Sequence, residues 1–245
     1  MFRPMIDKHK KNFQPDCIRD YIDAFLYEQK YGKEKEYFTD PQLRVTVRDL
    51  FVGGTETTST TLAWLFLGLL NYPDYHEKIV AEVDEVLGGS GNPSMAHRPD
   101  MPVTCAFIQE VMRYCAIIPI ALTHKTTQDT TLYGFTLPKG TAVTSSIHVV
   151  HFDPQNFPNP HVFNPGRHID ENGKFVYSAK VVAFSLGRRA CLGEALAKME
   201  VFLIFVGILQ KFIISSGSTD LPTMRDGNMG LFYGPKPYKV ILELR

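Results

Sequence analysis

The stretch from Gln42 to Asn71 constrains the fold more than any other part of the sequence. It is about 30 residues long and is predicted to be one helix, which Tyr72-Pro73 ends because a residue before proline disfavours the helical conformation. At a rise of about 1.5 Å per residue, such a helix would span roughly 45 Å. The sequence therefore predicts a single helix as long as a substantial domain is wide.

The remaining segments predict a mainly helical chain with strands in its second half. Further helices are predicted at residues 18–31, 73–87, 102–118 and 192–209. Between Ala121 and Val150, β-branched runs broken by Gly and Pro turns predict short strands. The segment from Phe212 to the end likewise predicts short strands joined by Gly and Pro turns. Residues 153–165, with four prolines, predict ordered coil. The fold class expected is α+β, mainly α, with small β-sheets in the second half.

Composition excludes several functional classes. The 245 residues carry 26 Lys+Arg and 26 Asp+Glu, so the net charge gives no reason to propose a nucleic-acid partner. The four cysteines have no paired spacing, so neither a disulfide framework nor a cysteine-rich zinc module is indicated, and we expect reducing surroundings. The longest apolar runs, Leu62–Leu70 and Val201–Leu209, are too short to span a membrane and predict buried helices. The N-terminus lacks the apolar run of a signal peptide.

Cys191 lies in a segment suited to a ligand-binding sulfur. A cysteine in an apolar context is usually a small core residue, but the glycines at 187 and 193 would let a flat ligand approach the backbone closely. A thiolate at the predicted helix start gains from the helix macrodipole, and Arg189 adds a nearby cation. These residues predict a sulfur held ionised as a metal ligand.

The same segment resembles the haem-binding signature of the cytochrome P450 family, F-x-x-G-x-R-x-C-x-G. Phe184, Gly187, Arg189, Cys191 and Gly193 match it. The resemblance implies that Cys191 is the thiolate ligand of the iron of haem b, that Arg189 contacts a haem propionate, and that the other three residues shape the cofactor site. A thiolate ligand pushes electron density onto iron and favours O–O cleavage.

A second motif lies in the middle of the long helix. Gly53 and Gly54 are unfavourable there by about 1 kcal/mol each relative to Ala, so a kink or a close helix contact is one interpretation. No Gly-Lys-Ser/Thr follows, which excludes a phosphate loop. The segment resembles the family's (A/G)-G-x-(D/E)-T-(T/S) motif. That resemblance implies that the glycines leave room for dioxygen, that Thr57 forms a hydrogen bond in oxygen activation, and that Glu56 helps deliver protons.

A third element is the pair Glu110 and Arg113. Alone, an acid and a base three residues apart on a helix are most often a solvated pair. The pair resembles the family's E-x-x-R motif, and residues 163–168 resemble F-x-P-E-R-F, although Gly166 and His168 depart from the commonest pattern. The resemblance implies that Arg167 joins Glu110 and Arg113 in a buried charge network that fixes the cysteine loop.

Three histidines complete the candidates. His124 alone indicates a surface residue at a strand edge, while the resemblance implies that it contacts a haem propionate. His148 and His151 lie three residues apart in a predicted strand, where they would point to opposite faces. We therefore expect them to be packing or surface groups and not a metal pair.

The resemblance extends from about residue 12 to the end of the chain and is most similar to animal microsomal family 2. It implies a haem-thiolate monooxygenase that inserts one atom of O2 into a lipophilic substrate, such as a xenobiotic, steroid or fatty acid, with electrons from NADPH through a reductase. By position, the residues expected to face substrate are Asp49, Phe51, Val52, Gly53, Ile117, Ile118, Ile120, Ala121, Leu122 and Leu231. Their largely apolar character suits such a substrate.

Complete members of the family are about twice this long. We therefore interpret residues 1–245 as a partial domain, the C-terminal half of the cytochrome P450 fold, in which the long helix and the helix after the cysteine loop enclose haem. The N-terminal membrane anchor would then be missing, and the full-length family resides at the cytosolic face of the endoplasmic reticulum. The alternative is a truncated, non-catalytic member that binds haem weakly or not at all. A member that rearranges peroxides without a reductase is disfavoured by Glu56 and Thr57.

Overall fold

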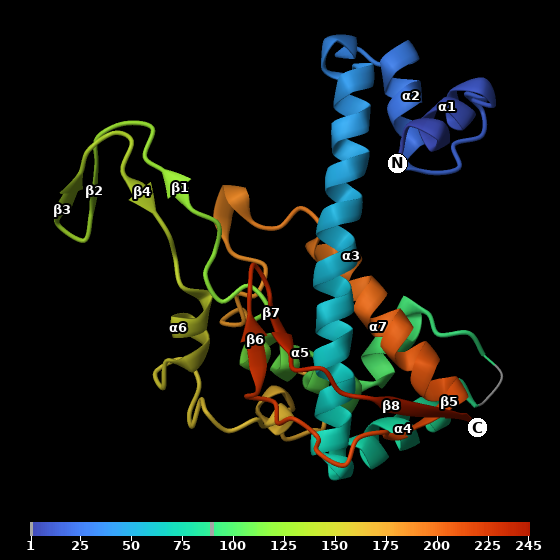
Figure 1. Ribbon diagram of the computed structural model, residues 1–245, viewed down its shortest axis with the longest axis vertical. Coiled ribbons are helices and arrows are strands. Elements are labelled where there is room, and N and C mark those ends of the chain that lie inside the picture. Colours follow the sequence, from blue (N-terminus) through green and yellow to red (C-terminus); the bar gives the residue numbers. More distant parts are fainter. Residues whose placement is uncertain (1, 89–90) are drawn as a thin grey trace. The chain divides into compact units, whose positions relative to one another are not determined.

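The computed structural model describes residues 2–88 and 91–245 (Figure 1). It divides into two compact units, residues 2–56 and Thr57–Arg245, and the division falls inside helix α3 (Asp40–Asn71). The predicted long helix is therefore confirmed and begins slightly earlier, at Asp40.

The N-terminal unit packs short helices around its own small core. It contains α1 (Arg3–Lys11), α2 (Tyr21–Tyr31), the 3-10 helix η1 (Lys35–Tyr37) and the first part of α3. Asp20 caps α2 by accepting hydrogen bonds from the backbone N–H groups of Ile22 and Asp23 at 2.9 and 3.1 Å, so α2 starts after the predicted Ile18. The buried core residues are Ile6, Ile22, Phe25, Leu26, Leu43 and Val47.

The C-terminal unit is built on helices that share one core. They are the rest of α3, α4 (Pro73–Leu87), α5 (Pro102–Cys115) and α7 (Glu194–Lys211). Trp64 is fully buried, and its indole N–H donates to the Tyr233 carbonyl at 3.0 Å. The rings of Phe107 and Phe205 stack with centroids 6.3 Å apart, joining α5 to α7. Helix α5 ends before the predicted Ile118, because Ala116 adopts a left-handed conformation with φ of 34°.

The described strands form two-stranded antiparallel sheets in the second half of the chain, as predicted. The pairs are β1 (His124–Lys125) with β4 (Ala142–Val143), β2 (Thr130–Leu132) with β3 (Phe135–Leu137), β5 (Phe212–Ser216) with β8 (Val240–Leu244), and β6 (Gly227–Met229) with β7 (Tyr233–Pro235). The four described pairs are separate sheets: β6 and β7 lie near α5 in Figure 1, whereas β1–β4 and β2–β3 extend away from the helices. The expected mainly helical α+β class is confirmed.

The prediction of strands up to Val150 is wrong at its end, because Ile147–Phe152 forms helix α6. The hydroxyl of Ser146 caps it by accepting a hydrogen bond from the Val149 N–H at 3.2 Å. His148 and His151 therefore lie on a helix and not on opposite faces of a strand. His151 is fully buried, as a packing residue should be, while His148 is exposed.

Short 3-10 helices complete the unit: η2 (Met95–Asp100), η3 (Pro165–His168) and η4 (Gly187–Arg189). The two long apolar runs lie in α3 and α7, which supply buried residues to the core. Across residues 2–88 and 91–245, no helix combines the length and apolar content needed to cross a membrane.

Candidate functional site: a buried charge network and an exposed cysteine loop

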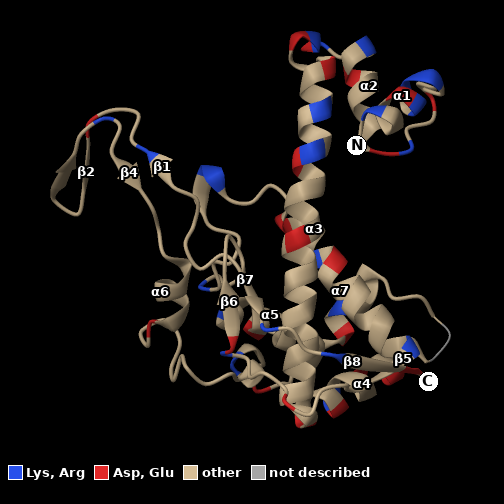
Figure 2. Ribbon diagram, viewed as in Figure 1, with Lys and Arg blue, Asp and Glu red and all other residues tan. Residues whose placement is uncertain are grey.

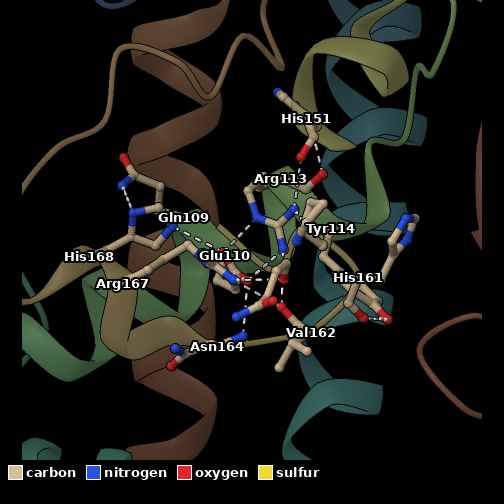
Figure 3. Close-up of polar contacts among 12 residues, drawn as sticks. Gln109, Glu110, Arg113, Tyr114, His151, His161, Val162, Asn164, Arg167 and His168 are labelled. Carbon is tan, nitrogen blue, oxygen red and sulfur yellow. Dashed lines mark hydrogen bonds and ion pairs between the residues drawn. The ribbon is translucent and has the colours of Figure 1, made fainter. Parts of the chain in front are cut away.

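Glu110 and Arg113 form a fully buried ion pair on α5 (Figure 3). The guanidinium binds both carboxylate oxygens, with Nη2 to Oε1 at 2.7 Å and Nε to Oε2 at 2.8 Å. Arg167 of η3 adds its Nε at 3.2 Å from Oε1, and the backbone N–H of Asn164 donates to the same oxygen at 2.9 Å. The interpretation of a solvated pair is therefore wrong, and the structure brings together the three predicted network residues.

His168 also belongs to this network, although sequence reasoning did not assign it there. Its Nε2 lies 3.1 Å from Glu110 Oε2, and its Nδ1 lies 2.8 Å from the Gln109 side-chain nitrogen. That amide is oriented by two further bonds, since its nitrogen donates to the Val176 carbonyl and its oxygen accepts from the Ser178 N–H, both at 3.3 Å. Nδ1 is therefore an acceptor, and Nε2 carries the hydrogen that is donated to Glu110. The available signal was the departure from the commonest motif at position 168.

These contacts keep Glu110 ionised. Burial by itself would raise the pKa of its carboxyl group, but hydrogen bonds from Arg113, His168 and the Asn164 backbone outweigh it, so the pKa lies below its ordinary value. Arg113 also donates from Nη1 to the carbonyls of His151 and Pro160 at 2.9 and 3.0 Å. The network therefore holds α6 and the proline-rich coil against α5.

The cysteine loop contrasts with this network in its exposure. Cys191 is exposed just before α7, and its backbone N–H donates to the Phe184 carbonyl at 2.9 Å. Gly187 has φ of +78°, a conformation that disfavours a side chain, so the loop needs glycine there. Gly193 directly precedes the first residue of α7. Arg188 and Arg189 make η4 a basic surface element, coloured blue in Figure 2.

The residues of this loop fit the haem group that the resemblance implies. Cys191 offers a soft sulfur donor, which suits iron. Leu186 and Leu192 on either side are 70% and 91% exposed and so present apolar surface to a flat macrocycle. Arg189 is exposed and can pair with a carboxylate. The donor set and the apolar surroundings both agree with a thiolate-ligated porphyrin.

A pocket of the C-terminal unit joins the long helix to the start of the cysteine loop. It is partly open to solvent. Its lining residues are Thr57, Thr58, Thr61, Val111, Met112, Ile117, Ala183, Phe184, Ala197 and Val201. Thr58 is buried and its hydroxyl lies 3.4 Å from Glu200 of α7. The pocket thus brings together Thr57 and Phe184, predicted from separate motifs, and Ile117, predicted by position to face substrate.

The glycines of α3 are not explained by close packing of another described element. A side-chain carbon at Gly53 or Gly54 would meet no atom within 4 Å in the described parts of the chain. Both residues lie within an unbroken helix, next to Glu56 in the N-terminal unit. Within the N-terminal unit, packing therefore does not require glycine at either position.

The other predicted substrate-facing residues have different surroundings. Ile120 and Leu122 are 61% and 73% exposed, whereas Ala121 between them is buried in a small cluster with Ala116 and Ile147. The structure therefore does not support Ala121 as a substrate-facing residue, because an extended backbone turns alternate side chains to opposite sides. Ile118 is half-buried and Leu231 is exposed.

Two further predictions fall on exposed elements. In the N-terminal unit, Phe51 and Val52 are 50% and 62% exposed, and the Asp49 carboxylate pairs with Arg48 at 2.9 Å. His124 is exposed on β1, where it pairs with Val143 of β4. A contact of His124 with a propionate therefore remains a prediction.

Comparison with known proteins identifies the family. The family model described as cytochrome P450 matches residues 1–242. Cytochrome P450 2J5 of Mus musculus is 41% identical over 237 residues, covering 96% of this chain and 47% of that relative. Cytochrome P450 2J2 of Homo sapiens is 41% identical over 238 residues, with coverage of 96% and 47%.

A more distant organism gives the same picture. Cytochrome P450 2L1 of Panulirus argus is 39% identical over 246 residues, covering 99% of this chain and 50% of that relative. The chain thus spans about half the length of the curated relatives that it matches, and this half is their C-terminal one. Together with the cysteine loop, the glycine-containing long helix and the buried Glu110–Arg113 pair, these matches show that the chain belongs to the cytochrome P450 family.

Proposed function

We propose that residues 1–245 form the haem-binding part of a haem-thiolate monooxygenase that inserts one oxygen atom from O2 into a lipophilic organic substrate. The observation that carries this proposal is the exposed thiol of Cys191 at the start of α7, in a loop whose first residue, Phe184, lines the same pocket as Thr57. When bound, haem supplies the activation of dioxygen. The chain's own residues would bind haem and transfer protons.

Cys191 would ligate the iron, and Arg189 and His124 would pair with the propionates. The exposed apolar side chains Leu186 and Leu192 would contact the macrocycle and exclude water from around the sulfur. Gly53 and Gly54, which lack side chains, would leave room for dioxygen. Each of these assignments uses residues that the structure leaves accessible.

Protons would be handled by adjacent residues of α3. The Thr57 hydroxyl would donate a hydrogen bond from Oγ1, and the Glu56 carboxyl group would accept a proton from solvent and pass it on. Ile117, Ile118, Ile120, Leu122 and Leu231, together with Asp49, Phe51, Val52 and Gly53, would contact the substrate. Their apolar majority favours a largely apolar substrate, such as a xenobiotic, steroid or fatty acid, over a small polar metabolite.

Electrons would come from NADPH through a reductase, and the full-length protein would act at the cytosolic face of the endoplasmic reticulum membrane. The half that this chain does not span would hold the anchor and the lid over the substrate. Cytochromes P450 2J5 and 2J2 are similar to this chain over nearly its whole length, which supports the assignment to a microsomal group.

The test is the spectrum of the reduced, CO-bound protein after reconstitution with haem. Thiolate ligation shifts the Soret band strongly to the red, and Cys191→Ala should abolish that shift. The exposed thiol Cys17 gives a matched control, since Cys17→Ala should retain it. An unshifted band in a protein that holds haem would contradict Cys191 as the ligand. A wild-type chain that takes up no haem would favour the non-catalytic alternative.

The role of Thr57 is tested separately. Thr57→Ala should decouple electron use from product, with more hydrogen peroxide released and less substrate oxidised per NADPH, because the hydroxyl that positions a proton is lost. Thr55, whose hydroxyl already donates to the Phe51 carbonyl at 2.7 Å, supplies the control substitution Thr55→Ala. Equal coupling in wild type and Thr57→Ala would refute the proton role.

A further inference from the structure

His151 is placed between the buried network and the cysteine loop. Its Nδ1 lies 2.9 Å from the Arg113 carbonyl, and its Nε2 lies 2.8 Å from the backbone N–H of Val182. The partners fix the tautomer: a carbonyl can only accept, so Nδ1 carries the hydrogen, and Nε2 accepts from the amide. The ring is fully buried and packs edge-on against Phe157.

The contacts between Arg113 and His151 are reciprocal. The Arg113 guanidinium donates to the His151 carbonyl at 2.9 Å, while the His151 ring donates to the Arg113 carbonyl at the same distance. Because Arg113 is held by both oxygens of Glu110, the position of His151 is set by the buried network. Figure 3 shows the His151 side chain and Arg113 in this arrangement.

From His151 the contacts lead directly to the cysteine. Val182 accepts its own hydrogen bond from the Ser185 N–H at 2.9 Å, which closes a turn at the start of the loop. Phe184, two residues after Val182, accepts from the Cys191 N–H at 2.9 Å. An unbroken series of hydrogen bonds and short backbone links therefore connects Glu110 to Cys191.

We propose that His151 is the positioning residue that fixes the cysteine loop on the buried network, through the acceptor that its Nε2 offers to Val182. This proposal rests on the proposed role of Cys191 as a haem ligand. Without that acceptor the Val182 amide has no partner at this position, the turn at Ser185 loosens, and the backbone that carries Cys191 is held less firmly. The network would then be intact but no longer coupled to the loop.

Two substitutions test the two ring nitrogens of His151 separately. Asparagine at 151 can reproduce the donor at Nδ1 but is too short to reach Val182, whereas glutamine places an amide oxygen where Nε2 stood. His151→Gln should therefore keep the bond to the loop, and His151→Asn should lose it. His148→Gln on the same helix removes an exposed histidine and serves as the control.

The first measurement is the thiolate band of the reduced, CO-bound protein. In His151→Asn the ratio of thiolate-shifted to unshifted haem should fall about tenfold, a change equivalent to about 1.4 kcal/mol. His151→Gln and His148→Gln should match the wild type. If His151→Asn retains the wild-type ratio, or if the glutamine variant loses the band equally, the proposal is overturned. A wild type without the band contradicts the proposed function and leaves the second measurement to decide.

The second measurement needs no haem. In the chain without haem, hydrogen exchange of the Cys191 amide should be about tenfold faster in His151→Asn than in wild type, while the amides of α5 keep their protection. Unchanged exchange at Cys191 would overturn the proposal. Loss of protection throughout α5 would also overturn it, because His151 would then support the fold as a whole and not the loop.

Discussion

The two polar regions of the C-terminal unit differ in where their charges face. Around Glu110, the chain itself supplies every partner that the carboxylate uses, and Glu110, Arg113 and His168 are buried. Around Cys191, the arginines of η4 and the thiol are exposed, and Leu186 and Leu192 extend apolar side chains into solvent. The Glu110 network satisfies its charges within the chain, whereas the cysteine loop leaves its cationic, thiol and apolar groups accessible to a ligand.

We therefore expect the buried network to affect the stability of the fold and the exposed cysteine loop to affect ligand binding. A buried ion pair contributes little net stability but is costly to break, because the remaining partner stays buried and uncompensated. Exposed side chains usually contribute little to the free energy of unfolding, so substituting those of the cysteine loop should change it by less than about 0.5 kcal/mol. Substitutions in the network should therefore affect unfolding, and those of the exposed side chains Leu186, Arg189, Cys191 and Leu192 should mainly affect ligand binding.

The largest expected effect is on the network. Glu110→Ala should lower the free energy of unfolding by about 3–5 kcal/mol, because it leaves Arg113 buried without a counter-charge. Urea denaturation measures this. Arg48→Gln breaks an exposed pair, whose contribution is only about 0–1 kcal/mol, and is the control. Similar effects of the two changes would abolish the distinction between the regions.

The next effect is a loss of stability in acid. Burial lowers the pKa of His151 from an ordinary 6.5 to about 4, so the unfolded chain binds its proton first as pH falls. The contribution of neutral His151 is complete above about pH 6.5 and is lost between there and pH 4. Unfolding free energy should fall by about 2 kcal/mol from pH 7 to pH 5.

The lowered pKa of Glu110 adds a second loss, confined to pH below about 4.5, where the unfolded carboxyl group becomes protonated. His151→Asn should remove the part of the slope between pH 7 and 5, while His148→Gln should keep it. Denaturation at each pH measures both variants. An unchanged slope in His151→Asn would show that another group titrates.

A smaller effect is expected at His168. His168→Phe supplies the aromatic residue of the commonest family motif, yet it should cost about 1–3 kcal/mol, since Glu110 loses a donor and the Gln109 amide loses an acceptor. His161→Phe, at an exposed position, should change stability by less than about 0.5 kcal/mol. A stabilised His168→Phe variant would show that packing outweighs hydrogen bonding at this position.

The smallest expected effect is at the cysteine itself. Cys191→Ser should change the unfolding free energy of the haem-free chain by less than about 0.5 kcal/mol, because the side chain is exposed. The same variant should lose the thiolate band. Thermal unfolding and the CO spectrum together measure the two results. A large loss of stability in this variant would place the cysteine loop with the network as a structural element.

Local patterns predicted the elements with strong signals. Pro73 and Gly88 bounded α4 correctly, since proline at the first turn and a left-handed glycine at the end act within a few residues. The β-branched run before Val150 misled, because the Ser146 cap and burial of Ile147 and His151 favoured a helix. In this segment, capping and tertiary packing outweighed the strand propensity of the β-branched residues.

The sequence by itself determined the family, the candidate ligand Cys191, and the likeness of Glu110, Arg113 and Arg167 to a known network. These follow from residue types at fixed spacing, which a chain carries whether or not it is folded. Only the tertiary structure decided that His168 and Gln109 complete the network and that His151 links it to the loop. Those contacts join residues 31 to 59 positions apart, and such pairs are defined by packing and not by any local pattern.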